Sequence, residues 1–344
     1  LRGRLLPGKG RAKLGGIESV LGTLEELDRL TIVGCGSAYY AGLLGKHYLE
    51  TYAGLPTEVD LASEYRYRHK ESVGQEAVLA VSQSGETADT LASLRDAKER
   101  GLFTLGLVNV VGSTIARETD AGVYNHAGPE IAVASTKAFL SQVTVFVLLT
   151  LLLGRQRGIL SAEDGEVVVR ELRDLPKTLQ TFLKEVESPV QAVAKRYAVY
   201  DNAMFIGRHF HAPIAAEGAL KLKEVAYVHA EAYPSGELKH GPIALLDEQF
   251  PVIALAPKDA VYEKMRSNIE EVRARRAPVL VLASEGDTLL ANLADDVIRV
   301  PHAHPMLQPL LMTVPLQLLA YHIGIARGLN VDRPRNLAKS VTVE

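Results

Sequence analysis

The sequence has little cysteine, little net charge and no familiar nucleotide-binding glycine motif, and each shortage excludes a class of protein. Its single cysteine, Cys35, cannot form an internal disulfide framework and fits a reducing, cytoplasmic environment. The formal net charge is −3, and no basic stripe with interleaved aromatics is present, which argues against a nucleic-acid partner. The G-C-G at residues 34–36 lacks the third glycine of the dinucleotide fingerprint, and there is no G-x-x-x-x-G-K-[ST] loop.

Long hydrophobic runs are also missing. The most apolar segment, residues 143–153, is interrupted by Thr144 and Thr150, so it predicts a core helix and no membrane partner. The chain opens without an initiator Met or a signal-type apolar region, which suggests a piece of a longer protein. What remains is an ordinary globular composition of 344 residues, 47% hydrophobic and 23% charged, long enough for two domains.

The order of the predicted elements repeats when the chain is laid on itself with a shift of about 173 residues, which is the distance from Gly34 to Gly207. Short apolar strands recur in both halves, and helical stretches follow them. The paired strands are residues 30–34 and 203–207, 78–81 and 252–255, 105–108 and 279–282, and 122–124 and 296–298. Strands that alternate with helices predict parallel sheets with helices on both faces, so we expect two doubly wound α/β domains. A charged helical stretch over residues 161–195, broken at Pro176, would connect them.

The stretch VLAVSQSGETADT, residues 78–90, joins a buried strand to a helix through a turn rich in hydroxyl groups. Unpaired backbone N–H groups and the positive end of the helix dipole meet there, and Ser82, Ser84 and Thr87 add neutral donors. This arrangement predicts an anion-binding cradle, although serine and threonine also favour helix starts as simple N-caps. In such sheets ligands bind outside the carboxyl ends of the strands, where this turn lies.

A second strand-to-helix turn, Gly34-Cys35-Gly36-Ser37, is expected at the same edge of the sheet. Its glycines permit close approach of a ligand to the backbone, and Ser37 can donate a hydrogen bond. We interpret Cys35 as a small packing residue and not as a nucleophile.

The second half of the chain carries a charged cluster on an otherwise apolar helix, EGALKLKEVAY. Glu217, Lys221 and Glu224 fall at helical spacing and therefore share one face. Solvated ion pairing explains most faces of this kind, but the apolar neighbours favour burial, where a carboxylate can serve as a base. His240 follows in the loop SGELKHGP, where an imidazole that titrates near neutrality suits acid–base chemistry.

Together these motifs resemble one family. The chain is similar to the isomerase half of glutamine:fructose-6-phosphate amidotransferases in the motifs CGSA, SQSGETADTL, EIAVASTKAF, EGALKLKE, GELKHGP and PRNLAKSVTVE, in this order from residue 1 to residue 344. The resemblance implies two sugar isomerase (SIS) domains, each a flavodoxin-like α/β sandwich, followed by an irregular tail. It implies ketose/aldose isomerisation of hexose 6-phosphate, with fructose 6-phosphate, glucose 6-phosphate and glucosamine 6-phosphate as ligands. In the complete enzyme, a glutaminase domain supplies the ammonia that converts fructose 6-phosphate to glucosamine 6-phosphate.

The resemblance also implies which residues bind the substrate. Neutral donors and a helix dipole would hold the 6-phosphate, without a metal or a cofactor. By motif, the phosphate-binding residues are Ser37, Ser82, Gln83, Ser84 and Thr87. Val133 and Ser135 would line the sugar.

Five charged residues would carry the chemistry that the resemblance implies. Glu224 would move the proton between carbons 1 and 2, supported on its helix face by Lys221 and Glu217. His240 would open the sugar ring, reaching it from the neighbouring subunit of a homodimer. Lys339 would form a Schiff base with the ketose carbonyl, an electron sink that acidifies the adjacent C–H. Without the resemblance, Lys339 reads as a solvated tail lysine.

Two residues depart from the sequence pattern of this family. Ala38 stands where many relatives carry a serine, and Ala132 where glycine is usual. The expected organisation is a linker remnant over residues 1–17, SIS domains over 18–160 and 196–330, the helical connection over 161–195, and a catalytic tail over 331–344. Two other functions stay open: a stand-alone SIS-type glucosamine-6-phosphate deaminase or hexose-phosphate isomerase, and a non-catalytic sugar-phosphate sensor.

Overall fold

The structure, a computed structural model, describes residues 1–68 and 74–343, so Glu344 of the predicted tail lies outside the described residues. The chain divides into two compact units. The first contains residues 1–131, residues 135–173 and the tail from Ala338 onward, and the second contains residues 132–134 and 174–337. Each unit holds one five-stranded sheet. The domain boundaries that we expect from the sequence were placed by its motifs, and they remain predictions.

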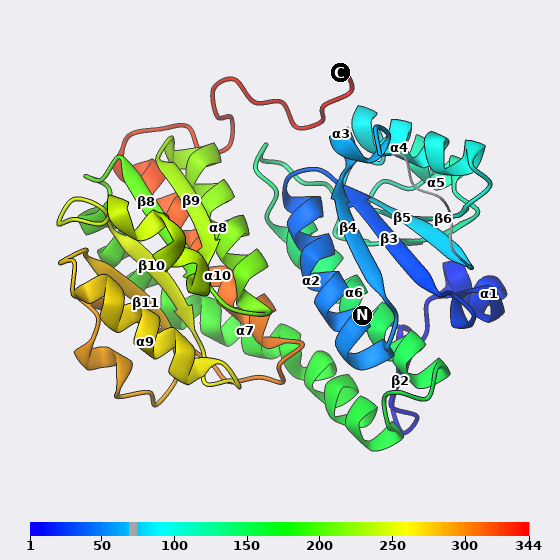
Figure 1. The fold of residues 1–344 in the computed structure, drawn as a ribbon, viewed down its shortest axis with the longest axis horizontal. Helices are drawn as coiled ribbons and strands as arrows, with labels where there is room; N and C mark the ends of the chain where they lie inside the picture. Colours follow the sequence, from blue (N-terminus) through cyan, green and yellow to red (C-terminus); the bar gives the residue numbers. More distant parts are fainter. Residues whose placement is uncertain (69–73, 344) are drawn as a thin grey trace. The chain divides into compact units, whose positions relative to one another are not determined.

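The first unit is built on a parallel sheet with the strand order β4-β3-β5-β6-β7 (Figure 1). Its strands are β3 (Arg29–Gly34), β4 (Thr57–Leu61), β5 (Glu76–Ser82), β6 (Phe103–Val108) and β7 (Ala121–Tyr124). Counted from β3, the order is 2-1-3-4-5, the flavodoxin-like order in which ligands bind where the strand order reverses. That reversal lies between β3 and β5, which pair at Val33 and Ala80.

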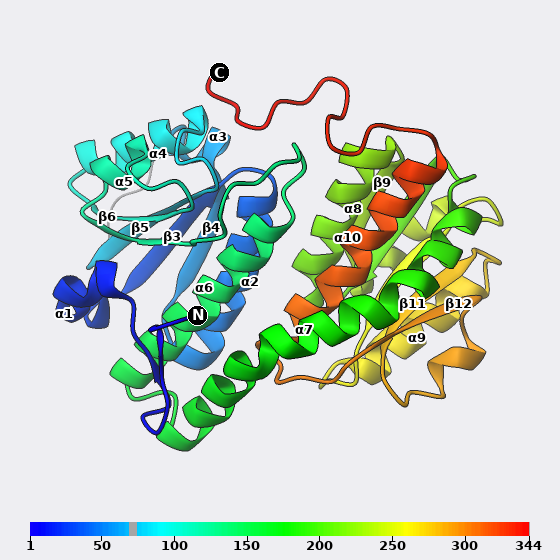
Figure 2. The same ribbon diagram turned by 180° about the vertical axis from the view of Figure 1, so that it is seen from behind.

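Helices cover both faces of this sheet, as Figures 1 and 2 show. One face carries α2 and α6, which pack against each other, and the other carries α3, α4 and α5. The helices of this unit are η1 (Gly15–Val20), α1 (Leu21–Glu25), α2 (Ser37–Ala53), α3 (Ala62–Tyr65), α4 (Ala88–Glu99), α5 (Thr114–Glu118) and α6 (Lys137–Gln156). Because both faces are covered, β5 is buried from Ala77 to Ser82, which explains its unbroken apolar run.

The second unit repeats this design with the strand order β12-β11-β10-β8-β9, all parallel. Its strands are β8 (Asn202–Gly207), β9 (His229–Pro234), β10 (Val252–Ala256), β11 (Val279–Ser284) and β12 (Asp296–Val300). Its helices are α8 (His211–Ala226), η2 (Ser235–His240), η3 (Pro242–Leu245), α9 (Tyr262–Arg273), η4 (Leu290–Asn292) and α10 (Gln308–Ala326). α8 packs against α10, while α9 contributes to the apolar core formed with β8, β10 and β11.

The sequence predicted the fold class correctly and missed one strand in each sheet. All eight strands expected from apolar runs are present, and the irregular tail after residue 330 is confirmed. β4 and β9 escaped prediction because they are edge strands with polar residues and only partial burial. Both lie beside the first strand of their sheet and complete the 2-1-3-4-5 order.

The expected break at Pro176 is wrong, because α7 runs without interruption from Ala162 to Tyr197. Proline removes one helical hydrogen bond and crowds the preceding turn, at a cost of about 3 kcal/mol. The helix keeps a buried apolar stripe on both sides of the proline, including Leu172, Leu175 and Phe182. Burial of about 1.5–3 kcal/mol per large apolar side chain outweighs that cost.

The N-terminal segment forms an antiparallel hairpin, β1 (Leu5–Leu6) with β2 (Arg11–Ala12), inside the region predicted as a linker remnant. The carboxylate of Glu166 on α7 accepts hydrogen bonds from Gly8 N at 2.8 Å and Gly10 N at 3.1 Å. This segment is therefore tied to the first turns of α7.

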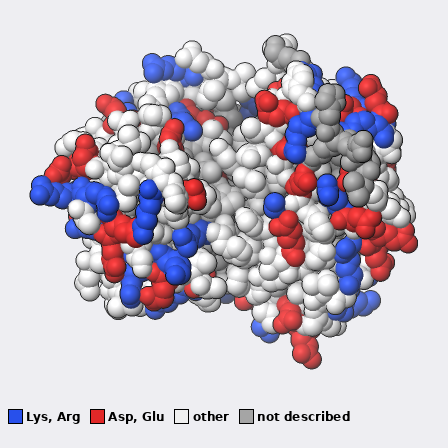
Figure 3. Space-filling model, viewed as in Figure 1, with Lys and Arg blue, Asp and Glu red and all other residues white. Residues whose placement is uncertain are grey.

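Two helices, α6 and α10, are long and apolar enough to cross a membrane by length and composition alone. Of their most apolar windows, 78% and 72% respectively are buried inside the protein, as in the core helices of globular domains. On the face shown in Figure 3, basic and acidic side chains are interspersed over both units. Basic residues form no continuous stripe on that face.

Candidate active site

The two turns predicted to bind an anion follow β3 and β5, the strands that flank the reversal of strand order in the first unit. The topology therefore brings Ser37, at the start of α2, to the same sheet edge as Ser82 and Thr87. Cys35 Sγ of the first turn lies 3.9 Å from Thr90 Oγ1 in the first turn of α4. Burial raises the pKa of the Cys35 thiol, so this residue fits the packing role expected from the sequence.

The Ser82–Thr87 turn is held by its own hydroxyl groups. Ser82 Oγ accepts a hydrogen bond from Gly85 N at 2.9 Å and lies 2.9 Å from Thr87 Oγ1, while Glu86 N donates to Ser84 Oγ at 3.2 Å. Gly85 has φ +68°, and a Cβ there would meet Ser113 Oγ at 2.0 Å, so only glycine fits. Thr87 occupies the N-cap position of α4, yet its side chain makes no capping bond. The simple N-cap interpretation therefore does not explain this turn.

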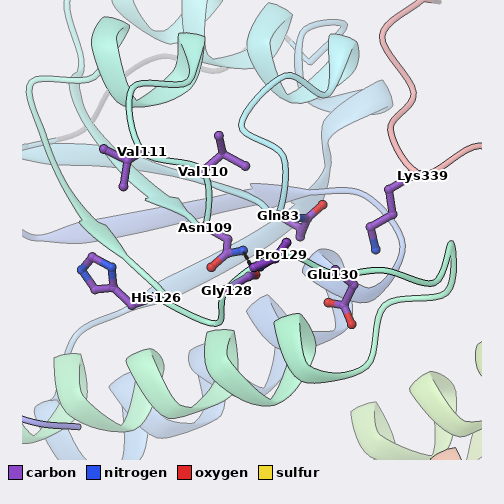
Figure 4. Close-up of a pocket in the computed structure, with 9 residues that line it drawn as sticks. All are labelled: Gln83, Asn109, Val110, Val111, His126, Gly128, Pro129, Glu130 and Lys339. Atoms are coloured by element: carbon purple, nitrogen blue, oxygen red, sulfur yellow. Dashed lines mark hydrogen bonds between the residues drawn. The ribbon is translucent and has the colours of Figure 1, made fainter.

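The C-terminal tail lies directly on the turn. Ser340 Oγ is 3.0 Å from Ser84 Oγ, and Ala88 N at the start of α4 donates to the Val341 carbonyl at 3.1 Å. These two bonds carry Lys339 into a depression of about 590 Å³ that Gln83 also lines. Figure 4 shows the Lys339 side chain reaching from the tail toward Gln83 and Glu130. Lys339 is therefore half-buried and lines this depression together with Gln83.

Two residues that line this depression were missed in the sequence. Asn109, directly after β6, donates from Nδ2 to the Gly128 carbonyl at 2.8 Å and accepts from Ala127 N at 2.8 Å. Glu130 accepts from Thr136 N and Ala138 N at 3.1 and 2.9 Å, so its carboxylate caps the N-terminus of α6. The position of Asn109 after a strand of the sheet was a signal that could have identified it.

Two members of the charged trio on α8, Lys221 and Glu217, are buried, and the third, Glu224, is half-buried. Lys221 is 2% exposed and Glu217 1%, with Lys221 Nζ 3.4 Å from Glu217 Oε1 and bonded also to Glu224 Oε2. Glu224 keeps 21% of its side chain exposed. Burial by itself would lower the pKa of Lys221, but the two carboxylates outweigh burial and raise it. Solvated ion pairing is therefore excluded for Lys221 and Glu217, and Glu224 is the most exposed member of the trio.

The remaining predicted residues lie in both units. His240 ends the 3-10 helix η2 of the second unit and is exposed, and no hydrogen bond or ion pair in the described part of the chain joins it to Glu224. Val133 belongs to the second unit, where its N–H donates to the Asp332 carbonyl at 3.0 Å, and Ser135 belongs to the first unit. Among the described residues, no group of three or more His, Cys, Asp or Glu side chains suits a metal ion.

Comparison with known proteins shows which family this chain belongs to. The SIS domain model matches twice, over residues 23–152 and 197–327. The glutamine–fructose-6-phosphate aminotransferase (isomerizing) of Thermus thermophilus is 52% identical over 344 residues, which is 100% of this chain and 56% of the relative. The chain thus spans about half the length of the curated relatives it matches.

Solved structures agree with that assignment. The C-terminal domain of glucosamine-fructose-6-phosphate aminotransferase from Francisella tularensis is 37% identical, with a TM-score of 0.89 over 94% of this chain and 91% of that one. A glucosamine-6-phosphate deaminase from Thermotoga maritima has a TM-score of 0.73 over 94% of both chains, but at 24% identity it shows the fold alone. The chain belongs to the SIS domain family, as a double-SIS chain that corresponds to the C-terminal, isomerase half of the glutamine–fructose-6-phosphate aminotransferases.

Proposed function

We propose that this chain interconverts ketose and aldose forms of hexose 6-phosphate and, within a longer protein, converts fructose 6-phosphate and ammonia to glucosamine 6-phosphate. One observation carries the proposal: the tail bonds to the hydroxyl turn through Ser340 and Val341 and thereby brings Lys339 beside Gln83. The fold by itself does not require a lysine in a depression next to the hydroxyl turn. A substrate with a phosphate group and a carbonyl group would use both, the phosphate at the turn and the carbonyl at Lys339.

The phosphate end of the substrate would occupy the hydroxyl turn. Ser37, Ser82, Gln83, Ser84 and Thr87 supply neutral donors there, and α4 adds the positive end of its dipole. A ligand phosphate would take the place of Val341 O at Ala88 N or extend the same donor set. Val133 and Ser135 are proposed to line the sugar.

The reacting end would lie at the Lys339 amine. In the reaction with ammonia, the amine adds to the carbonyl at carbon 2 and water leaves; ammonia then replaces the lysine on the iminium carbon, so the Lys339 amine leaves free and the new imine acidifies the proton on carbon 1. In the isomerisation without ammonia, the open-chain carbonyl acidifies the same proton. Glu224 then takes that proton and returns it to carbon 2, while Lys221 and Glu217 hold the carboxylate on α8. His240 is proposed to open the ring first, acting in a homodimer as a residue of the neighbouring subunit. The complete reaction, with ammonia from a glutaminase domain, would take place in the cytoplasm.

Isomerisation without glutamine tests the proposal directly. The purified chain is incubated with fructose 6-phosphate in deuterium oxide, and NMR follows both glucose 6-phosphate and exchange of the carbon-bound proton. We expect both signals from the wild-type chain, and we expect Glu224→Gln to lose exchange while binding of the sugar phosphate stays nearly intact. Glu187→Gln, an exposed glutamate on α7, is the matched control and should keep both.

The alternatives predict different results in this experiment, or in a second one that supplies glucosamine 6-phosphate or ammonia with fructose 6-phosphate. A non-catalytic sensor would bind fructose 6-phosphate without exchange, which would overturn the proposal. A deaminase would release ammonia from glucosamine 6-phosphate faster than it forms glucosamine 6-phosphate from the ammonia and fructose 6-phosphate supplied. Loss of both binding and exchange in Glu224→Gln would identify Glu224 as a structural partner of Lys221 instead.

A further inference from the structure

The second sheet has its own reversal of strand order, between β8 and β10, and its chemistry differs from that of the first. In the first unit, the position after Gly34 at the end of β3 is the small residue Cys35. The corresponding position after β8 is Arg208, which is half-buried. Its Nε donates a hydrogen bond to Ser235 Oγ at 3.0 Å. Arg208, at the strand-reversal edge of the second sheet, is therefore bonded to Ser235 in the same unit.

Ser235 is the first residue of η2 and is fully buried. Its hydroxyl accepts from Arg208 and lies within donating distance of two α9 acceptors, Asn268 Oδ1 at 2.8 Å and Met265 Sδ at 3.0 Å. Gly236 follows, and a Cβ at that position would meet the Arg208 guanidinium at 2.5 Å. A buried hydroxyl whose donor and acceptor are both used therefore joins the start of η2 to α9 and to the residue that follows β8.

The network continues along α9 to the other end of η2. Asn268 Nδ2 donates to Glu271 Oε2 at 3.3 Å, and Glu271 Oε1 pairs with Lys239 Nζ at 2.7 Å. Lys239 immediately precedes His240 in the chain. Between the two ends, Leu238 is fully buried in the core of this unit. Polar bonds therefore hold η2 at both ends, with an apolar anchor between them.

The position of His240 depends on the bonds that hold η2. Its side chain is exposed, and in the described part of the chain it makes no hydrogen bond or ion pair that orients it. Its location is therefore set by the backbone of η2. We propose that Arg208, Ser235, Asn268 and Glu271 are positioning residues that hold η2 so that His240 meets the ring oxygen of the sugar. This inference rests on the proposed function and adds that His240 is positioned from the strand-reversal edge of the second sheet.

A substrate that needs no ring opening distinguishes a variant that misplaces His240 from a variant whose whole active site is impaired. In 5-deoxyfructose 6-phosphate the hydroxyl that closes the furanose ring is missing, so the ketone is permanently open. Exchange of the carbon-1 proton with deuterium is measured on this compound and on fructose 6-phosphate, for the full chain and for Asn268→Ala. We expect Asn268→Ala to slow exchange on fructose 6-phosphate by roughly tenfold to a hundredfold, and to change the rate on the open compound less than about twofold. His240→Ala should show the same selective loss.

Further variants keep the test decisive. Lys239→Met removes the exposed end of the network and leaves the core unchanged, so it reports on the proposal even where a core variant fails to fold. Asn292→Ala, an exposed asparagine of the same unit, should behave as wild type on both substrates. Equal losses on both substrates, or wild-type rates in Asn268→Ala and Lys239→Met, would overturn the positioning role alone. A wild-type chain inactive on both substrates would instead refute the proposed function.

Discussion

Replacing the buried cation on α8 tests the energetics of the proposed site. Lys221 is 2% exposed and faces Glu217, itself 1% exposed, at 3.4 Å. In Lys221→Met, the carboxylate of Glu217 keeps its burial and loses its cation. Breaking a buried pair from one side costs about 3–5 kcal/mol of unfolding free energy. Methionine has nearly the length of the lysine stem, so the packing contribution should stay below about 1.5 kcal/mol.

Urea unfolding, followed by circular dichroism without ligand, measures this loss. Lys223→Met is the matched control, because Lys223 is exposed on the same helix, and it should stay within about 0.5 kcal/mol of wild type. The double change Glu217→Gln with Lys221→Met removes the uncompensated charge and should recover most of the loss. The reasoning would be refuted by a Lys221→Met chain within about 1 kcal/mol of wild type, or by a double variant as unstable as the single one.

Three further predictions address ligand, pH and assembly. Ser84→Ala should weaken hexose-phosphate binding by about 1–2 kcal/mol in titration calorimetry, since one charge-assisted bond is lost; binding that depends on a chelatable metal would contradict this. The pKa of Lys221 is raised in the folded chain. Its charge therefore stabilises the fold fully below the unfolded value of about 10.4, and the contribution disappears as pH rises through the folded value. Urea midpoints should fall above about pH 10.4 in wild type and less steeply in Lys221→Met. Mixed dimers of inactive His240→Ala and Glu224→Gln chains should regain activity, because half of their sites combine both intact residues; confirmed mixed dimers without activity would place His240 in the site of its own chain.

The sequence alone determined the elements whose signal is local. Apolar runs such as Val78 to Val81 specify buried parallel strands, because a sheet covered on both faces leaves no polar alternation. The hydroxyl turn after β5 was visible because strand, turn and helix are contiguous. Glu217, Lys221 and Glu224 were placed on one face by helical spacing. The edge strands β4 and β9 were missed because their partial burial leaves no clear pattern.

Only the tertiary structure decided which distant residues meet. Ser340 bonds to Ser84 across 256 positions of the chain, and this contact turns Lys339 from a tail residue into part of the first unit's depression. Whether Lys221 is solvated or buried depended on how the second unit packs around α8, which helical spacing does not encode. The bonds from Arg208 to Ser235 and from Ser235 to Asn268 likewise join three separate elements. Local periodicity reports how a segment presents its faces, whereas these contacts arise from sheet order and from the need to satisfy buried polar groups.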